Sequence, residues 1–247
     1  MRSFSGSLGS LWRWFIHDQR AVQVMIVLVI GIDLLLGLTH VVIMTFFDAP
    51  NVWRIDMDWS FAEAYQYMKY FWVAALLVWY ARATRGWAIL AWVPLIVFFL
   101  LDDAMLLHEQ AGLWFAAQPW AFDVGPLSAQ TVGELGFVAV IGAVLVIPIV
   151  GLYAMSRARM RWIFRLLAAI VVAFLLFAVV VDAGHSLVQN IRILDRSFGF
   201  IEDGGEMILL SLLVLVVFRL NIGGGTLGFS LSRADTAAPV ASVVRPA

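Results

Sequence analysis

The chain has 247 residues, a net charge of −1 and no cysteine. Hydrophobic residues make up 63% of it and charged residues 13%, whereas a soluble domain is roughly half apolar and about one quarter charged. This composition excludes an ordinary soluble domain, a disulfide framework, thiolate metal sites and cysteine catalysis. Without the basic patch typical of nucleic-acid-binding proteins, we expect no nucleic-acid partner and a lipid bilayer as the surroundings.

The N-terminal segment differs from the apolar runs that follow it. Residues 8–20, LGSLWRWFIHDQR, place aromatic and aliphatic side chains among arginines. This pattern is typical of a helix that lies in the membrane interface, so residues 1–20 are predicted to form a cytoplasmic interfacial helix. The first apolar run is too long for a signal peptide, and no small-residue cleavage site follows it.

Six stretches are long and apolar enough to cross a membrane as helices, which takes about 20 residues each. They cover residues 22–47, 62–81, 87–109, 131–155, 164–188 and 202–220. Because backbone polar groups in lipid must be satisfied internally, these spans are helices. The sequence therefore predicts an all-α polytopic membrane protein, with a six-transmembrane-helix bundle over residues 21–221 and a flexible cytoplasmic tail over residues 222–247.

The basic residues predict how the spans are oriented. Twelve of the 16 lysines and arginines lie before the first span, between the second and third, between the fourth and fifth or at the start of the fifth, or from the end of the sixth onward. The opposite side holds only Arg54, Arg192 and Arg196, and Lys69 lies within the second span. Cytoplasmic loops collect basic residues, so both termini are predicted to be cytoplasmic, in a bacterial cytoplasmic (inner) membrane.

Ionisable side chains within the spans gather in the predicted outer half of the bilayer. Spacings of three or seven residues place the members of the first three groups on one helix face, and the members of the fourth fall within one arc of about 100°. The groups are Asp33 with His40, Asp102 with Glu109, Asp182 with His185, and Glu202 with Asp203 and Glu206; Asp103 and His108 flank the second group. Since a charge in hydrocarbon costs about 2.5–3.5 kcal/mol on insertion scales, these side chains are predicted to face the bundle interior and to form a functional site.

A bound cation would relieve the repulsion among these carboxylates. Imidazole and carboxylate together suit zinc, iron or manganese, which predicts a transition-metal site. The candidate ligands are Asp33, His40, Asp102, His108, Glu109, Asp182, His185, Glu202 and Glu206. If the site is catalytic, the metal would activate water or oxygen for a lipid-soluble substrate that enters from the outer half of the bilayer; the sequence leaves open whether the protein is an enzyme.

Other interpretations fit the same residues. Haem b needs two histidines on facing helices, and His40, His108 and His185 could supply them in a non-enzymatic haem- or pigment-binding subunit of a larger membrane complex. Chains of Asp, Glu and His also serve proton- or ion-coupled transporters, although the inner halves of these spans are apolar. Glu63, Glu134, Glu202 and Asp203 also fit acidic first turns at the water interface, and Lys69 fits either snorkelling or pairing with an acid.

Overall fold

The computed structural model describes residues 20–47, 51–125, 127–188 and 192–222. The elements in chain order are α2 (Arg20–Phe46), η1 (Asn51–Trp53), α3 (Phe61–Thr84), η2 (Trp87–Trp92), α4 (Val93–Met105), α5 (Leu107–Ala116), α6 (Ala129–Met155), α7 (Ala158–Val188) and α8 (Arg192–Ile222). In the helices, the side chains of residues 178–188 and 192–198 are not described. The predicted interfacial helix and tail lie outside the described residues, apart from Arg20 and Ile222.

Five helical segments are long and apolar enough to cross a membrane: Arg20–Phe46, Trp87–Met105, Ala129–Met155, Ala158–Phe177 and Gly199–Ile222. The described elements are all helices, which confirms the all-α prediction, and these five segments support the prediction of a multi-pass membrane protein. The helix α3 has 24 residues, but its first half carries Glu63, Gln66 and Lys69, and it is not among these five. Its role as the sixth span, and the side on which the termini lie, stay predictions.

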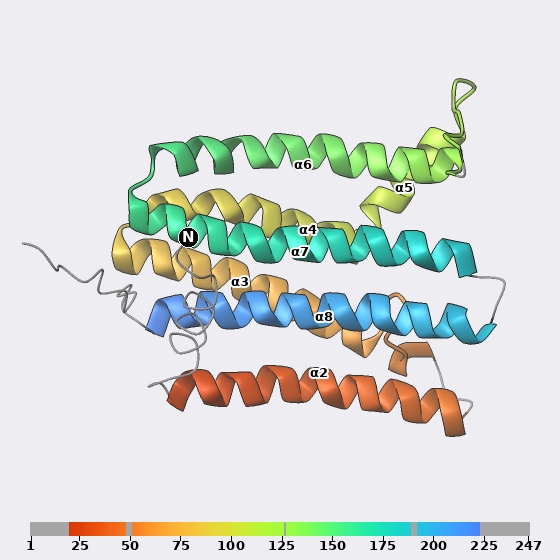
Figure 1. Ribbon diagram of the computed structural model, residues 1–247, viewed down its shortest axis with the longest axis horizontal. Helices are drawn as coiled ribbons and strands as arrows, with labels where there is room; N and C mark the ends of the chain where they lie inside the picture. Colours follow the sequence, from red (N-terminus) through yellow and green to blue (C-terminus); the bar gives the residue numbers. More distant parts are fainter. Residues whose placement is uncertain (1–19, 48–50, 126, 189–191, 223–247) are drawn as a thin grey trace, which may run out of the picture.

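The long helices lie side by side, with α2 and α6 at opposite edges of the bundle (Figure 1). The polar helix α3 packs against both α8 and α4, and α2 reaches the bundle mainly through α8. The largest core cluster is centred on these contacts and includes Val73 and Leu77 of α3 and Val214 and Val217 of α8. Because the lipid around the bundle is as apolar as these side chains, close packing is the main force between the helices.

The two ends of the bundle are chemically different. We call the end with residues 51–60 and 117–128 the distal end, and the end with the turns at residues 85–86 and 156–157 the proximal end. In Figure 1 the distal end is on the right. The polar contacts described below lie between the middle of the bundle and its distal end.

The predicted third span over residues 87–109 is not one helix. It breaks at Leu106, whose φ of 50° and ψ of 46° are left-handed, a conformation that costs roughly 1–2 kcal/mol for a residue with a side chain. The Asp102 carboxylate offsets this cost because it accepts a hydrogen bond from the His108 amide at 2.9 Å and so caps α5. The prediction that Asp102 and Glu109 share one helix face is therefore wrong.

Glycines allow two close helix contacts. A Cβ atom at Gly205 of α8 would overlap the Phe177 ring of α7, and a Cβ atom at Gly112 of α5 would overlap the Glu134 side chain of α6. Small residues commonly let membrane helices approach this closely. The α7–α8 contact fixes the position of Phe177, which forms part of the groove described below.

Candidate functional site

A buried ion pair joins three helices in the middle of the bundle. The Lys69 ammonium of α3 lies 2.6 Å from Oδ1 of Asp33 in α2, and neither side chain has exposed area. Ser211 of α8 donates to Oδ2 of Asp33 at 2.5 Å, and Lys69 also donates to the Met207 carbonyl at 2.9 Å. The ammonium lies 4.3 Å from the centre of the Tyr65 ring. We call Asp33, Lys69 and Ser211 the central cluster.

The central cluster compensates its own charges. Burying an ion pair is favourable only when its geometry is good and its remaining hydrogen-bonding groups are satisfied. Here both carboxylate oxygens accept a hydrogen bond, and the ammonium has the Asp33 carboxylate, a carbonyl and an aromatic face as partners. The arrangement therefore ties α2 to α3 and α8. Of the two roles predicted for Lys69, snorkelling and pairing with an acid, the structure shows the pairing.

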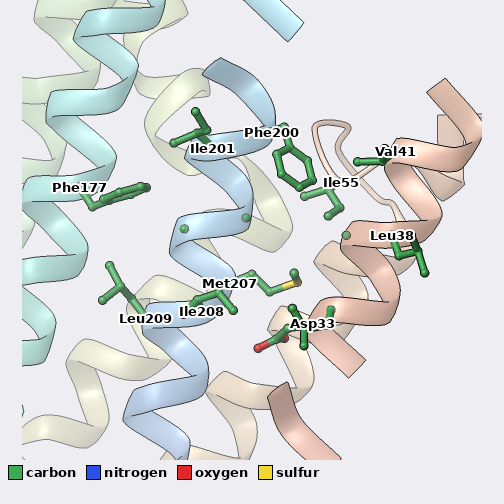
Figure 2. A pocket seen from close by; sticks show the side chains of 14 residues that line it. Asp33, Leu38, Val41, Ile55, Phe177, Phe200, Ile201, Met207, Ile208 and Leu209 are labelled. Atoms are coloured by element: carbon green, nitrogen blue, oxygen red, sulfur yellow. The ribbon is translucent and has the colours of Figure 1, made fainter. Parts of the chain in front are cut away.

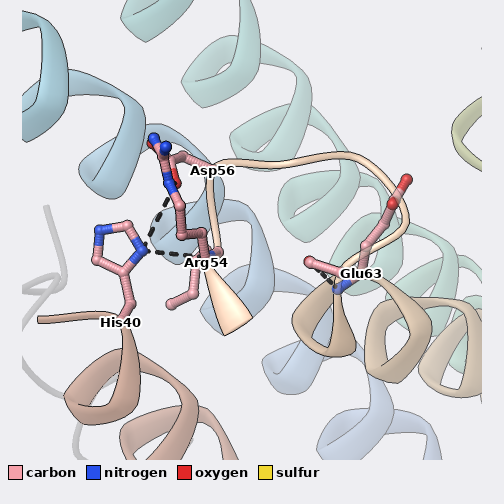
Figure 3. A network of polar contacts seen from close by, with 6 residues as sticks. His40, Arg54, Asp56 and Glu63 are labelled. Atoms are coloured by element: carbon pink, nitrogen blue, oxygen red, sulfur yellow. Dashed lines mark hydrogen bonds and ion pairs between the residues drawn. The ribbon is translucent and has the colours of Figure 1, made fainter. Parts of the chain in front are cut away.

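His40 makes a different kind of contact, near the distal end of α2. It lies on the same buried face as Asp33, as the spacing of seven residues predicts. The Ile55 amide of the following loop donates to His40 Nδ1 at 3.0 Å, and the nearest oxygen of Asp56 lies 3.6 Å from the same nitrogen (Figure 3). His40 therefore holds the loop against α2.

An ion pair in this loop supports the contact. Arg54 donates to both carboxylate oxygens of Asp56, at 2.9 and 2.6 Å. Burial acts to raise the pKa of Asp56, but the hydrogen bonds and charge of Arg54 outweigh it and hold that pKa below its ordinary value. The same hydrogen bonds raise the pKa of Arg54. The pair thus stays charged and keeps the loop in one shape.

Asp102 and His108 form a second acid–histidine contact, at the break between α4 and α5. Oδ2 of Asp102 lies 3.1 Å from Nδ1 of His108, and about a third of the His108 side chain, 34%, is exposed. The hydrogen bond from Asp102 raises the pKa of His108 against the effect of burial. Burial raises the pKa of the neighbouring Glu109 carboxyl. We call Asp102 and His108 the helix-break pair.

Glu63 and Glu134, two acids near the starts of α3 and α6, make hydrogen bonds within the first turns of their helices. Ser60 caps α3 by accepting from the Glu63 amide at 3.2 Å, and the Glu63 carboxylate accepts from the Trp59 amide, which is close to a capping box. Glu134 accepts from the Gln130 side chain at 2.9 Å. These contacts agree with the interpretation of Glu63 and Glu134 as residues of polar first turns.

The predicted metal ligands are spread over separate places. Asp33 belongs to the central cluster, His40 to the loop contact, and Asp102 and His108 to the helix-break pair. Among the described residues, no group of three or more His, Asp or Glu side chains is arranged to hold a metal ion. Asp182 and His185 lie in α7 outside the described side chains, and Glu202 and Glu206 are half-buried in α8. The metal, haem and pigment sites therefore stay predictions.

An apolar groove of about 640 Å³ runs between α2 and α8, beside the central cluster (Figure 2). It lies within segments that are apolar enough to span a membrane. Its walls include Leu34, Gly37, Leu38 and Val41 of α2, Phe200, Ile201, Gly204 and Ile208 of α8, Phe177 of α7 and Ile55 of the loop. Asp33 is the one ionisable residue in the described lining, and its carboxylate is already held by Lys69 and Ser211. Binding sites for small molecules commonly have volumes of about 300–1,000 Å³ and mostly apolar walls.

Sequence reasoning missed several of these residues. Ser211 is a single hydroxyl within the apolar run LLSLLVLV, and a lone hydroxyl in such a run is a usable signal for a buried polar partner. Ile55 gave no such signal, because it contributes its backbone amide to His40. The groove gave none either, since its apolar walls have the same composition as a face that contacts lipid.

Residues 21–220 match the family described as a domain of unknown function, DUF8692. The chain belongs to this family. The match covers all six predicted spans and leaves out the N-terminal segment and the tail. No curated protein and no solved structure matches the chain, so its function is argued from the geometry alone.

Proposed function

We propose that this membrane protein binds a lipid-soluble molecule with a long hydrocarbon portion, which enters the groove between α2 and α8 sideways from the bilayer. The observation that carries the proposal is the groove itself. It lies within segments that are apolar enough to span a membrane, and the side chains that line it are almost all apolar. A hydrocarbon chain needs no hydrogen-bond partner in such a site. The same proposal keeps the six-span bundle, with α3 as its interior span and both termini cytoplasmic.

The chemistry of the lining favours a hydrocarbon over a polar ligand. The side chain of Asp33 has no exposed area, so it has no surface to offer a ligand. A polar group of the ligand placed between Leu38 and Ile208 would lose its water without a replacement partner, which costs roughly 1–3 kcal/mol. The occupant is therefore an acyl or isoprenoid chain, and its polar part stays outside the groove.

The proposal supports binding and assigns no reaction. Of the functions predicted from the sequence, it is closest to an enzyme that takes a lipid-soluble substrate from the membrane, and it would serve equally a subunit that holds a lipid cofactor. A metal-dependent step stays a prediction. The enzyme and the cofactor-holding subunit would both bind a lipid-soluble ligand.

Filling the groove tests the proposal. Gly204 lines the groove, and a Cβ atom added to it would have nothing within 4 Å, so the first atom of a larger side chain in Gly204→Phe meets open space. The measurement uses protein in phosphatidylcholine nanodiscs and a fatty acid with a diazirine at its methyl end, with crosslinked sites mapped by peptide mass spectrometry. We expect crosslinks at groove residues, and we expect Gly204→Phe to reduce them, because its ring would occupy space that the hydrocarbon chain fills.

Gly31→Phe is the matched control. Gly31 also has open space around it and lies on α2, outside the groove lining. Its substitution should leave the groove crosslinks unchanged. Crosslinks spread evenly over the lipid-facing helices, or a dimer in native mass spectrometry that Gly204→Phe dissociates, would show instead that lipid contacts the groove without preference or that a second copy fills it.

A further inference from the structure

The end of α4 lies against the polar helix α3. The helix stops at Met105, before the left-handed Leu106, and Met105 also ends the segment that is apolar enough to span a membrane. The Tyr67 hydroxyl of α3 donates to the Asp103 carbonyl at 3.5 Å, which brings the last turn of α4 to α3. Asp103 therefore places a carboxylate at the C-terminal end of a helix, where the helix dipole is negative and favours a cation.

The hydroxyl of Tyr70, on the next turn of α3, lies near this carboxylate. Tyr70 is 2% exposed, and the charged groups that act on its hydroxyl are the carboxylates of Asp103, Glu206 and Asp102. They belong to α4 and α8, the two helices against which α3 packs. Within the part of the chain that the structure describes, the hydroxyl makes no hydrogen bond. Because a buried hydroxyl without a partner is unfavourable, an additional group between Tyr70 and Asp103 would stabilise this arrangement.

Gln66 adds a second oxygen of the same kind. It lies four residues before Tyr70, about one helical turn, and so on the same side of α3. Gln66 is 7% exposed, and its buried Oε1 atom accepts no hydrogen bond from any residue that the structure describes. A hydroxyl and an amide oxygen that both lack a donor, beside a carboxylate, form a set of oxygen ligands suited to a hard metal cation.

The surroundings of Asp103 leave its charge poorly compensated. The charged groups with the largest effect on Asp103 are Asp102 and Glu63, which are acids, and His108. His108 is already hydrogen-bonded to Asp102, and Lys69 is engaged in the central cluster. Because neighbouring carboxylates repel one another, a cation bound at Asp103 would relieve this repulsion.

We propose that Asp103, Tyr70 and Gln66 bind a monovalent metal cation such as Na⁺ between α3 and the end of α4. Asp103 is the carboxylate that interacts with the Tyr70 hydroxyl directly, and one carboxylate matches a single positive charge. The carbonyls at the ends of broken membrane helices commonly coordinate Na⁺, and α4 ends at such a break. None of the three residues lines the groove, so the cation site is independent of the function proposed above.

Equilibrium binding of radioactive Na⁺ tests the site. Purified protein in an uncharged detergent is immobilised on scintillation beads at neutral and at alkaline pH, and bound Na⁺ is displaced with unlabelled NaCl while choline chloride keeps the ionic strength constant. We expect saturable binding of one Na⁺ per chain. Asp103→Asn should abolish it, because the amide carries no charge. Tyr70→Phe should shift half-saturation to a higher Na⁺ concentration, because one oxygen ligand is lost.

Tyr80→Phe is the matched control. Tyr80 is also buried in α3, with 3% exposed, but it lies near the other end of the helix. Loss of its hydroxyl should leave Na⁺ binding unchanged. Thermal unfolding in choline chloride shows whether each variant is folded. Added Na⁺ should raise the unfolding temperature of the wild type and of Tyr80→Phe, but not that of Asp103→Asn, since a ligand that binds only the native state stabilises it.

The remaining outcomes would overturn the proposal. Without saturable Na⁺ binding to the wild-type protein at either pH, the space beside Tyr70 would be a site for water. Saturable binding that is unchanged in Asp103→Asn and in Tyr70→Phe would place Na⁺ elsewhere. Equal weakening by Tyr70→Phe and Tyr80→Phe would show that the hydroxyls act through the fold. If Asp103→Asn does not fold, Tyr70→Phe and its control still decide between these results.

Discussion

The central cluster and the helix-break pair both join an acid to a base, and they differ in how much of their binding capacity is used. Neither Asp33 nor Lys69 exposes any of its side chain, and their hydrogen bonds go to Ser211 and the Met207 carbonyl. The His108 side chain is 34% exposed, and its contact to Asp102 uses one ring nitrogen. The comparison indicates that the deep pair holds helices together, whereas the pair at the helix break can exchange protons with solvent.

Breaking the central ion pair should have the largest effect. Lys69→Met leaves the Asp33 carboxylate buried without its counter-ion, which should lower the free energy of unfolding by about 3–5 kcal/mol. The double variant Asp33→Asn with Lys69→Met should lose less than the sum of the single variants, because no unpaired charge is left behind. Thermal unfolding in detergent of the wild type, the two single variants and the double variant measures these losses of stability. Additive losses would show that the two residues do not stabilise one another.

Removing the hydroxyl of the same cluster should have a smaller effect. Ser211→Ala deletes one hydrogen bond to a charged oxygen, worth about 1.5–3 kcal/mol, and leaves the ion pair in place. Leu212→Ala is the control, since Leu212 is the next residue on α8 and is exposed. The same unfolding measurement should show a clear loss for the first variant and little for the second. Equal losses would mean that Ser211 acts only through its volume.

The helix-break pair should give the smallest effect and the one that depends on pH. Asp102→Ala removes the cap of α5 and should cost about 0.5–2 kcal/mol, whereas Asp102→Asn keeps an oxygen that can accept the His108 amide. The pKa of His108 is raised from its ordinary value of 6.5, so its charged form stabilises the fold. This contribution is complete below pH 6.5 and is lost as the pH rises through the raised pKa.

Both substitutions of Asp102 should remove this pH dependence, and only Asp102→Ala should also remove the cap. Unfolding temperatures measured from acid to alkaline pH would show whether the pH dependence of stability is lost. The NMR titration of the His108 ring would report the pKa of His108 directly. A His108 pKa at or below the ordinary value of 6.5 in the wild-type protein would contradict the prediction.

The sequence predicts the architecture well because bilayer thickness sets a length that an apolar run must reach. Five of the predicted spans are helices that are long and apolar enough to cross a membrane, and the spacing of seven residues correctly places Asp33 and His40 on one face. The second predicted span is harder to recognise, since Lys69 and Gln66 reduce its apolar character. Both side chains are buried within the bundle, and the pattern of a single helix contains no information about its neighbours.

The contacts of the candidate sites are less predictable, for reasons that differ from residue to residue. The partner of Lys69 is 36 positions away and could have been any nearby acid. The break at Leu106 follows no glycine or proline, so the sequence LLDDAMLLHEQ predicts a continuous helix. His40 is held by a backbone amide, which every residue except proline possesses, and no side-chain pattern indicates it.

The polarity of α3 has a consequence for how the chain enters the membrane during synthesis. Lysine at the centre of a span is unfavourable for insertion by about 2.5–3.5 kcal/mol, so in the six-span arrangement α3 gains little from partitioning into lipid by itself. Asp33 of α2 is already present when α3 emerges, but Ser211 and the Met207 carbonyl belong to α8, the last of the described helices to be made. In a nascent chain that ends before α8, the ion pair between Asp33 and Lys69 therefore lacks its hydrogen-bond partners from α8. We expect α3 to become stable in the bilayer only after α8 has been made.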